Sequence, residues 1–182
     1  MNIQFEKMHL KHQKDIFEWL EEPHIQEFWD NSQEHKDDIL NFMNGRTEPS
    51  NYFNGMHFYW VGNIDGKPYS LIMTYQENEE TDPPDYMKPY LSKTGKTFGL
   101  NFCIGNKNFL GQGLGASTLI AFMEYFSTLI ELKADTFLID PFINNPRAIH
   151  IYQKAGFRTM CEFIQEGGYF NQCKGVLMVK NL

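Results

Sequence analysis

The stretch Gly111-Gln112-Gly113-Leu114-Gly115-Ala116 has residue types that could bind a phosphate group. It stands between a predicted strand and a long predicted helix. Glycines at such a position let backbone N–H groups turn toward one point, and the N-terminus of the helix adds partial positive charge. We therefore expect an anion-binding site here, for a phosphate or a pyrophosphate.

Three ligands and one structural alternative compete as explanations of this glycine pattern. A Walker A loop is excluded, because no Gly-Lys-Ser/Thr ends the stretch. A dinucleotide site fits the pattern G-x-G-x-x-G/A, with Asp140 at the end of a later strand as a ribose-binding acid. The third ligand is the pyrophosphate of an acyl-CoA, and the alternative is a turn that binds nothing. Because the stretch follows antiparallel hairpins and precedes only one more helix, its position favours the acyl-CoA hypothesis.

Residues 140–157 read Asp-Pro-Phe-Ile-Asn-Asn-Pro-Arg-Ala-Ile-His-Ile-Tyr-Gln-Lys-Ala-Gly-Phe. This segment closely resembles a signature of the GNAT acetyltransferase superfamily: a strand end, an Asn, Arg-Ala, an apolar residue, a Tyr and Gly-Phe. Within that superfamily the chain is most similar to the aminoglycoside 6'-N-acetyltransferases and related siderophore-biosynthesis acyltransferases. Three further stretches carry this narrower resemblance: Glu18-Trp19-Leu20 with His24-Ile25 and Phe28-Trp29, Glu79-Glu80-Thr81-Asp82-Pro83, and Leu110-Gly111-Gln112-Gly113-Leu114-Gly115.

The resemblance implies an acetyl transfer from acetyl-CoA to a primary amine by direct attack in a ternary complex. It gives Tyr152 the role of general acid, because a phenol with a pKa of about 10 can protonate the departing thiolate. The alternative for Tyr152 is a core residue that packs against Ala148 and Gly156, and the alternative for Asn144 is an N-cap of the last helix. The implied cofactor-binding residues are Ile104, Leu110, Gly111, Gln112, Gly113, Leu114, Gly115, Ala116, Asn144, Arg147 and Tyr152.

The position of the general base departs from the family pattern. The 6'-acetyltransferases use a carboxylate on the strand before the glycine loop, and the matching residue here is Asn101. An amide cannot act as a general base. Asp82 or Glu77 could serve instead, or the amine arrives neutral. The catalytic candidates are thus Tyr152, Asn101 and Asp82, and the candidates for binding the acceptor are Trp29, Tyr75, Glu77, Glu80 and Asp82.

The acceptor expected from the resemblance is a small polycation, such as the 6'-amine of an aminoglycoside. Five carboxylates between residues 77 and 85 could hold its ammonium groups. An acyltransferase of siderophore biosynthesis is the enzymatic alternative, since a hydroxylamine acceptor needs no strong base and would tolerate Asn101. A protein that binds acyl-CoA without catalysis is the alternative from another class.

The hydrophobic periodicity predicts the elements that must position these residues. We expect strands at 2–8, 57–64, 68–75, 97–105, 136–140, 157–164 and 175–179, with a hairpin turn at Asp65-Gly66. Helices are expected at 15–20, from Pro23, at 34–43, 113–132 and 147–155, and residues 76–92 form an irregular acidic loop. The predicted fold class is α+β (mixed α/β): a single GNAT-type domain over residues 1–182, whose central, mixed, twisted sheet is flanked by helices.

Composition sets the remaining bounds. With 42% hydrophobic residues and a net charge of −7, the chain is predicted to fold and not to bind nucleic acid. No apolar run approaches the roughly 20 residues of a membrane helix, and no signal peptide is expected. The three cysteines show no metal-binding spacing, and we expect them to be buried. We thus expect a cytoplasmic monomer or homodimer without a metal ion.

Overall fold

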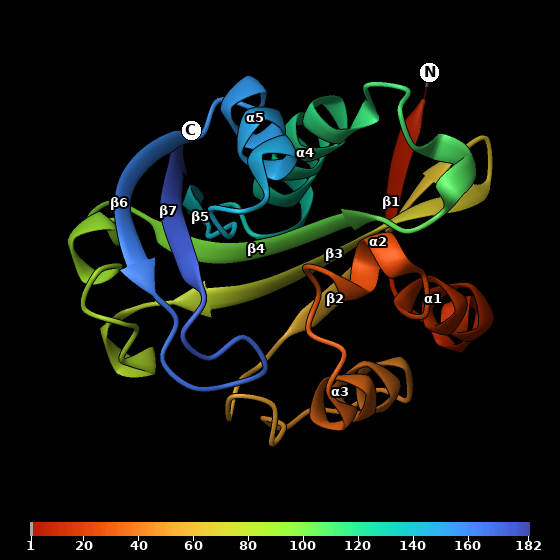
Figure 1. Cartoon of the computed structure of the whole chain (residues 1–182), viewed down its shortest axis with the longest axis horizontal. Helices are drawn as coiled ribbons and strands as arrows, with labels where there is room; N and C mark the ends of the chain where they lie inside the picture. The colour runs from red at the N-terminus through yellow and green to blue at the C-terminus, as the bar shows by residue number, and fades with distance from the viewer. Residues whose placement is uncertain (1) are drawn as a thin grey trace. The chain divides into compact units, whose positions relative to one another are not determined.

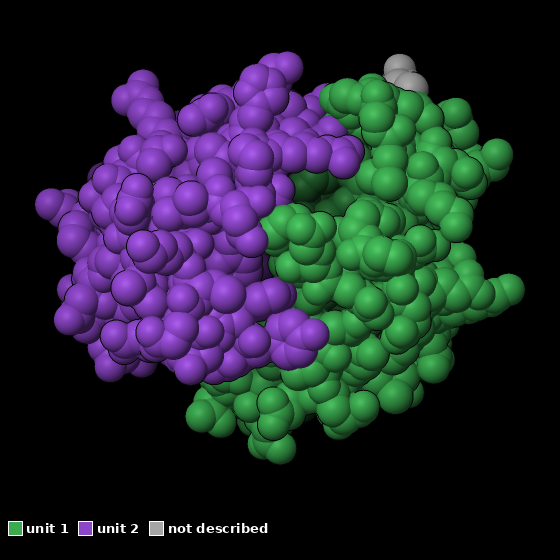
Figure 2. Space-filling model, viewed as in Figure 1, with its two compact units in different colours: residues 1–75, 102–114 green, residues 76–101, 115–182 purple. Residues whose placement is uncertain are grey.

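The computed structural model describes residues 2–182 and divides them into two compact units. Of the described residues, unit 1 comprises 2–75 and 102–114, and unit 2 comprises 76–101 and 115–182 (Figure 2). The chain therefore crosses from one unit to the other three times. Each unit combines strands with helices that cover them (Figure 1).

The strands of unit 1 are antiparallel. β1 (Ile3–Lys7) pairs with β2 (Phe58–Ile64), and β2 pairs with β3 (Lys67–Glu77). The turn between β2 and β3 is Asp65-Gly66, with φ of 50° and 73°. Two positive φ values in a row suit the right-handed twist of a two-residue hairpin, and the predicted hairpin is confirmed.

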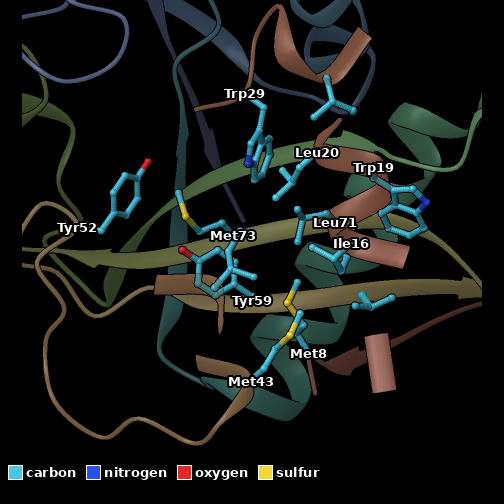
Figure 3. Packing of buried hydrophobic residues seen from close by; sticks show 13 residues of the cluster. Met8, Ile16, Trp19, Leu20, Trp29, Met43, Tyr52, Tyr59, Leu71 and Met73 are labelled. Atoms are coloured by element: carbon cyan, nitrogen blue, oxygen red, sulfur yellow. The ribbon is translucent and has the colours of Figure 1, made fainter. Parts of the chain in front are cut away.

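Three helices of unit 1 share a core with these strands. They are α1 (Gln13–Leu20), α2 (Pro23–Gln26) and α3 (Gln33–Met43). In the strands, Tyr59, Val61, Leu71 and Met73 alternate along one face, as the two-residue period of a strand requires. The helices pack their apolar faces on this set, as Figure 3 shows; they contribute Ile16, Trp19, Leu20, Ile25, Ile39 and Met43.

Unit 2 holds the parallel pairing. β4 (Lys96–Ile104) is parallel to β5 (Ala134–Ile139), and β7 (Lys174–Asn181) is antiparallel to both β5 and β6 (Arg158–Ile164). A parallel pair needs a long crossover, which the helix between β4 and β5 provides. With the antiparallel strands of unit 1, this confirms the predicted mixed sheet and the α+β class.

Two helices of unit 2 lie side by side, α4 (Leu114–Tyr125) and α5 (Pro146–Lys154) (Figure 1). The single long helix expected at 113–132 is wrong in its last part, because a π-helix follows at Phe126–Ile130. Ser127 and Thr128 both donate their hydroxyls to the carbonyl of Glu124, at 3.3 and 2.6 Å. Such bonds compete with the regular helical ladder and widen it locally.

The burial of the cysteines and the lack of a membrane-spanning helix are both predicted from the sequence. Cys103 and Cys161 are half-buried, but Cys173 is exposed in the loop between β6 and β7, so the prediction of three buried cysteines is wrong for this residue. No helix within residues 2–182 is both long enough and apolar enough to span a membrane.

Candidate active site

The connection from β5 to α5 carries several of the predicted site residues. β5 ends at Ile139, Asp140 follows, and α5 begins at Pro146, whose missing N–H costs nothing in a first helical turn. The side chain of Asn145 accepts a hydrogen bond from the N–H of Ala148 at 3.1 Å. The N-cap is therefore Asn145, and the alternative that assigned it to Asn144 is wrong. The exposed Asn144 keeps its side chain available for a ligand.

Tyr152 lies on the buried face of α5, with 7% of its surface exposed. Its ring lies 6.3 Å from that of Phe157. Arg147, one turn earlier, is exposed. The helix thus fixes the phenol within the protein and leaves the guanidinium in solvent.

The glycine stretch has the backbone geometry expected of a loop that approaches a ligand. Gly111 and Gly113 have φ of +75° and +72°, and a Cβ added at either would meet no atom within 4 Å. The space beside both residues is open. Glycine is therefore needed at these positions for the left-handed backbone conformation and not for close packing. Gln112 steadies the loop through a bond from its Nε2 to the carbonyl of Asn108 at 2.7 Å.

The residues on either side of these glycines are held by packing. Leu114 is buried with Ile64 and Tyr69 in a small cluster of unit 1, and the half-buried Ile104 packs against that cluster. The carbonyl of Ile104 also accepts a hydrogen bond from His24 Nε2 at 3.1 Å. Leu110 and Ala116 are half-buried. The backbone before and after the loop is therefore fixed.

The acidic loop, residues 76–92, is more ordered than expected, and its first two residues, Gln76 and Glu77, belong to β3 instead. Asn78 caps a short 3-10 turn at Glu79–Thr81, accepting bonds from two backbone N–H groups at 2.8 and 3.0 Å. Further on, Tyr86 stacks on Phe163 with ring centroids 4.4 Å apart, and Met87 is buried with residues of β5 and β7. These contacts fix the loop on the strands of unit 2.

The carboxylates of this loop have different surroundings. Lys88 Nζ lies 3.0 Å from Asp82 and 2.8 Å from Asp85, so both carboxylates already have a cationic partner. Glu80 is exposed, whereas Glu77 is half-buried and accepts a hydrogen bond from Thr81 Oγ1 at 2.7 Å. Of the loop carboxylates, Glu77 is the one that the structure places near Asp140.

Asp140 is the carboxyl with the most altered acidity. Burial raises its pKa to about 7, and the nearby charge of Glu77 adds to the shift. Burial also raises the pKa of Tyr86, with Asp140, Cys161 and Glu77 adding to it. From the sequence, Asp140 is expected only as a ribose ligand of a dinucleotide site. Its place at a strand end, directly before the loop that leads to Tyr152, is the signal that could have singled it out.

Asn101 lies on β4 and is half-buried. Its Oδ1 is buried without a hydrogen-bond partner among residues 2–182. An unpaired buried acceptor costs free energy unless a ligand or a water donates to it. The side chain can therefore accept a hydrogen bond, although it cannot remove a proton.

The two aromatic candidates for the acceptor site belong to unit 1. Trp29 has 6% of its surface exposed, and its Nε1 has no hydrogen-bond partner in the part of the chain that the structure describes. Tyr75 is half-buried near the end of β3, and its ring lies 5.6 Å from that of His57. No cluster of three or more His, Cys, Asp or Glu side chains suited to a metal ion occurs in residues 2–182.

The family model and the similar proteins of known function are all acetyltransferases. Residues 9–164 match the model of the acetyltransferase (GNAT) domain family. The aminoglycoside N(6')-acetyltransferase type 1 of Klebsiella pneumoniae is 28% identical over 151 residues, which are 78% of this chain and 67% of that protein. Its counterpart in Serratia marcescens matches with the same values.

Solved structures share the fold. The aminoglycoside N(6')-acetyltransferase of Legionella pneumophila superposes with a TM-score of 0.74 and 22% identity, covering 98% of this chain and 92% of that one. The aminoglycoside acetyltransferase AAC(6')-Ib, in complex with coenzyme A and kanamycin, gives a TM-score of 0.72 and 21% identity, covering 99% and 95%.

Proposed function

Since the chain belongs to the GNAT acetyltransferase family, we propose that it moves an acetyl group from acetyl-CoA to a primary amine by direct attack in a ternary complex. The single observation that supports an amine acceptor is the raised pKa of Asp140. A carboxyl with a pKa of about 7 suits a general base. The chain would thereby replace the carboxylate that is missing at Asn101.

The residues present fit acetyl-CoA. Gly111 and Gly113 leave open space beside a left-handed backbone, and the N-terminus of α4 follows directly. Backbone N–H groups and the helix dipole would hold a pyrophosphate there. The exposed Asn144 and Arg147 would contact the pantetheine arm and a phosphate, respectively. When bound, the cofactor supplies the acyl thioester.

Tyr152 would act as general acid. After the amine attacks the thioester carbonyl, the carbon–sulfur bond breaks and the sulfur leaves as a thiolate. A phenol within hydrogen-bond distance can donate its proton to that sulfur. The burial of Tyr152 on a helix supports this role, because a fixed donor loses little entropy in the reaction.

Asp140 would take the proton of the attacking amine. Near neutral pH a carboxyl with a pKa of about 7 is partly ionised, and it is basic enough to accept a proton. Glu77, whose charge helps to raise that pKa, would attract the ammonium form of the acceptor. Asn101 would accept a hydrogen bond from the amine through its unpaired Oδ1.

The acceptor that we propose is an aminoglycoside-like polycation. Two findings support this proposal: the relatives named above are aminoglycoside 6'-N-acetyltransferases, and one similar solved structure holds kanamycin. The exposed carboxylates of the acidic loop supply a matching negative field. Trp29 and Tyr75 would provide the ring faces against which the acceptor packs.

Asn101 favours one alternative acceptor, a hydroxylamine such as those acylated in siderophore biosynthesis. A hydroxylamine is neutral at physiological pH, so an amide that only accepts a hydrogen bond would suffice at this position. If Asp140 is the base, the alternative loses its main support.

The test is turnover of acetyl-CoA, followed by release of free thiol, with kanamycin, spermidine and an N-hydroxylated diamine. We expect turnover with kanamycin that falls by about 10²-fold in Asp140→Asn. Faster turnover with the hydroxylamine, unaffected by Asp140→Asn, would establish the alternative. A chain inactive with every acceptor would refute both.

A further inference from the structure

A continuous row of five rings runs through unit 1 from Trp29 to Tyr75. Neighbouring ring centroids lie 5.8, 4.4, 5.0 and 5.6 Å apart. The rings between the two ends belong to His35, Tyr52 and His57. Figure 3 shows Trp29 and Tyr52 within the same apolar cluster. We call these five residues the ring row.

His35 ties the Trp29 end of the row to the backbone. Its Nδ1 donates to the carbonyl of Asp30, the residue directly after Trp29, at 2.7 Å. The imidazole stacks on Trp29 at 20° and on Tyr52 at 3°. Burial lowers the pKa of His35, so the ring is neutral near neutral pH. The indole is thus held both through its own ring and through the peptide that follows it.

His57 ties the Tyr75 end of the row to a buried carboxylate. Its Nδ1 lies 3.6 Å from Asp38 Oδ2, which is too long for a hydrogen bond but close enough for an electrostatic contact. A Cβ at Gly55 would lie 2.5 Å from His57 Cε1, so the loop before β2 closes tightly over this ring. The imidazole therefore has little freedom to turn.

Asp38 is itself fixed by two strong contacts. Its carboxylate lies 2.8 Å from Arg46 Nε, and it accepts a hydrogen bond from Tyr59 at 2.6 Å. Burial would raise the pKa of Asp38, but contacts with His57, Tyr59, Ser50 and Arg46 lower it to about 2. Arg46 also donates to the carbonyl of His57 at 2.5 Å. A permanent ion pair thus anchors the loop that carries His57.

The ring row is poorly suited to stability alone. His35 Nε2 and Trp29 Nε1 are buried without hydrogen-bond partners among the described residues, and a buried polar atom without a partner is destabilising. A phenylalanine at position 35 could also stack between Trp29 and Tyr52, and it would leave no Nε2 unpaired. What it would lose is the hydrogen bond to the carbonyl of Asp30, which fixes the peptide beside Trp29.

We propose that His35 and His57 are positioning residues that fix the ring planes of Trp29 and Tyr75 for the acceptor. This inference rests on the proposed function, in which those two rings contact the acceptor. The imidazoles do not touch the reacting atoms. They set the orientation of the rings and thereby determine which acceptors bind, while acetyl-CoA binding and the chemical step do not depend on them.

The experiment compares His35→Phe with a matched control, His12→Phe. Both histidines are buried in unit 1, with 1% and 2% of their surfaces exposed, and burial lowers the pKa of both. His12 bonds to Glu6 and lies outside the ring row. We expect His35→Phe to raise the acceptor KM about 5- to 20-fold with kcat and the acetyl-CoA KM unchanged, whereas His12→Phe leaves all three unchanged. His35→Asn retains a donor for the Asp30 carbonyl and should restore part of the acceptor affinity.

A second measurement covers the case in which His35→Phe does not fold. Tyr52→Leu interrupts the row from the loop side, and it should raise the acceptor KM in the same selective way. The indole N–H signal of Trp29, assigned by its loss in Trp29→Phe, should shift in the ¹⁵N–¹H spectrum of Tyr52→Leu. The indole signals of Trp19 and Trp60 should stay in place.

The outcomes separate the two proposals. If the wild type acetylates an amine but the variants change kcat and both KM values alike, or change none of them, the positioning role is refuted and the proposed function stands. If the wild type acetylates no amine at all, the proposed function fails, and the positioning role fails with it.

Discussion

The Cβ position of Gly115, at the start of α4, lies 2.9 Å from Cγ2 of Ile151 on α5. The two helices therefore meet at a point where a side chain on Gly115 has no room. Gly115→Ala should lower the free energy of unfolding by about 1–3 kcal/mol, because the stiff, β-branched Ile151 must move. Chemical denaturation measures the change, and kcat should also fall, since Tyr152 is the next residue after Ile151.

A double variant checks the cause of this loss. If the clash with Ile151 is responsible, Gly115→Ala combined with Ile151→Ala should be less destabilised than the sum of the two single variants. Strict additivity would show that the loss at Gly115 has another origin.

Gly113→Val tests the proposed pyrophosphate site. Valine rarely adopts a φ of +72°, so the loop must change its conformation, and its N–H groups no longer converge. Calorimetry should show that acetyl-CoA binding is lost while the fold persists. Gly167→Val is the control, because Gly167 has a φ of +76° and open space around it but lies in the loop between β6 and β7. Equal acetyl-CoA affinity in the two variants would contradict the assignment.

Tyr152→Phe tests the general acid. Removing the hydroxyl should lower kcat by about 10²-fold and leave the dissociation constant of acetyl-CoA unchanged. Tyr125→Phe, at a half-buried tyrosine near the end of α4, should leave kcat unaffected. An unchanged rate in Tyr152→Phe would mean that water protonates the thiolate and that Tyr152 serves packing alone.

Local chemistry explains why most elements could be predicted from the sequence. The Asp65-Gly66 turn and the helix that begins at Pro23 depend on residues that lie next to one another. The π-helix at Phe126–Ile130 could not be predicted from the sequence. It depends on the hydrogen bonds that the hydroxyls of Ser127 and Thr128 donate to the carbonyl of Glu124. The observed N-cap is Asn145, whereas the sequence offered its neighbour Asn144 as a cap. The sequence alone does not distinguish two adjacent asparagines.

The candidate site was harder to predict, because its electrostatics depend on long-range contacts. Asp140 has a raised pKa because residues of the acidic loop, far earlier in the chain, fold against the strand that it follows. Likewise, the pairing of Lys88 with Asp82 and Asp85 cannot be read from the order of charges alone. The roles of Asn101, Asp82 and Tyr152 remain predictions.

The pH dependence should report Asp140. As a general base it must be ionised, so kcat/KM should rise with pH through about 7, and Asp140→Asn should remove that limb of the profile. Stability should change in the opposite sense. Because the folded pKa lies above the unfolded one, the stabilising effect of the protonated form is lost as pH rises through about 7. At pH 8 thermal unfolding should therefore show Asp140→Asn to be more stable than the wild type, by about 1–3 kcal/mol. If kcat/KM of the wild type does not change with pH around 7, the general base is another residue.

The acidic loop should attract a cationic acceptor, and Lys88 should oppose that attraction. Neutralising Glu80 and Asp82 together, to Gln and Asn, should raise the acceptor KM several-fold at low salt and leave the acetyl-CoA KM alone. Lys88→Gln should act in the opposite direction, because it frees the carboxylates of Asp82 and Asp85 from their partner at 3.0 and 2.8 Å. Both effects should shrink as salt rises, since the Debye length is about 10 Å at 0.1 M. A fall in kcat in the double variant would point to a base in the loop, and identical acceptor KM values in all three proteins would place the acceptor elsewhere.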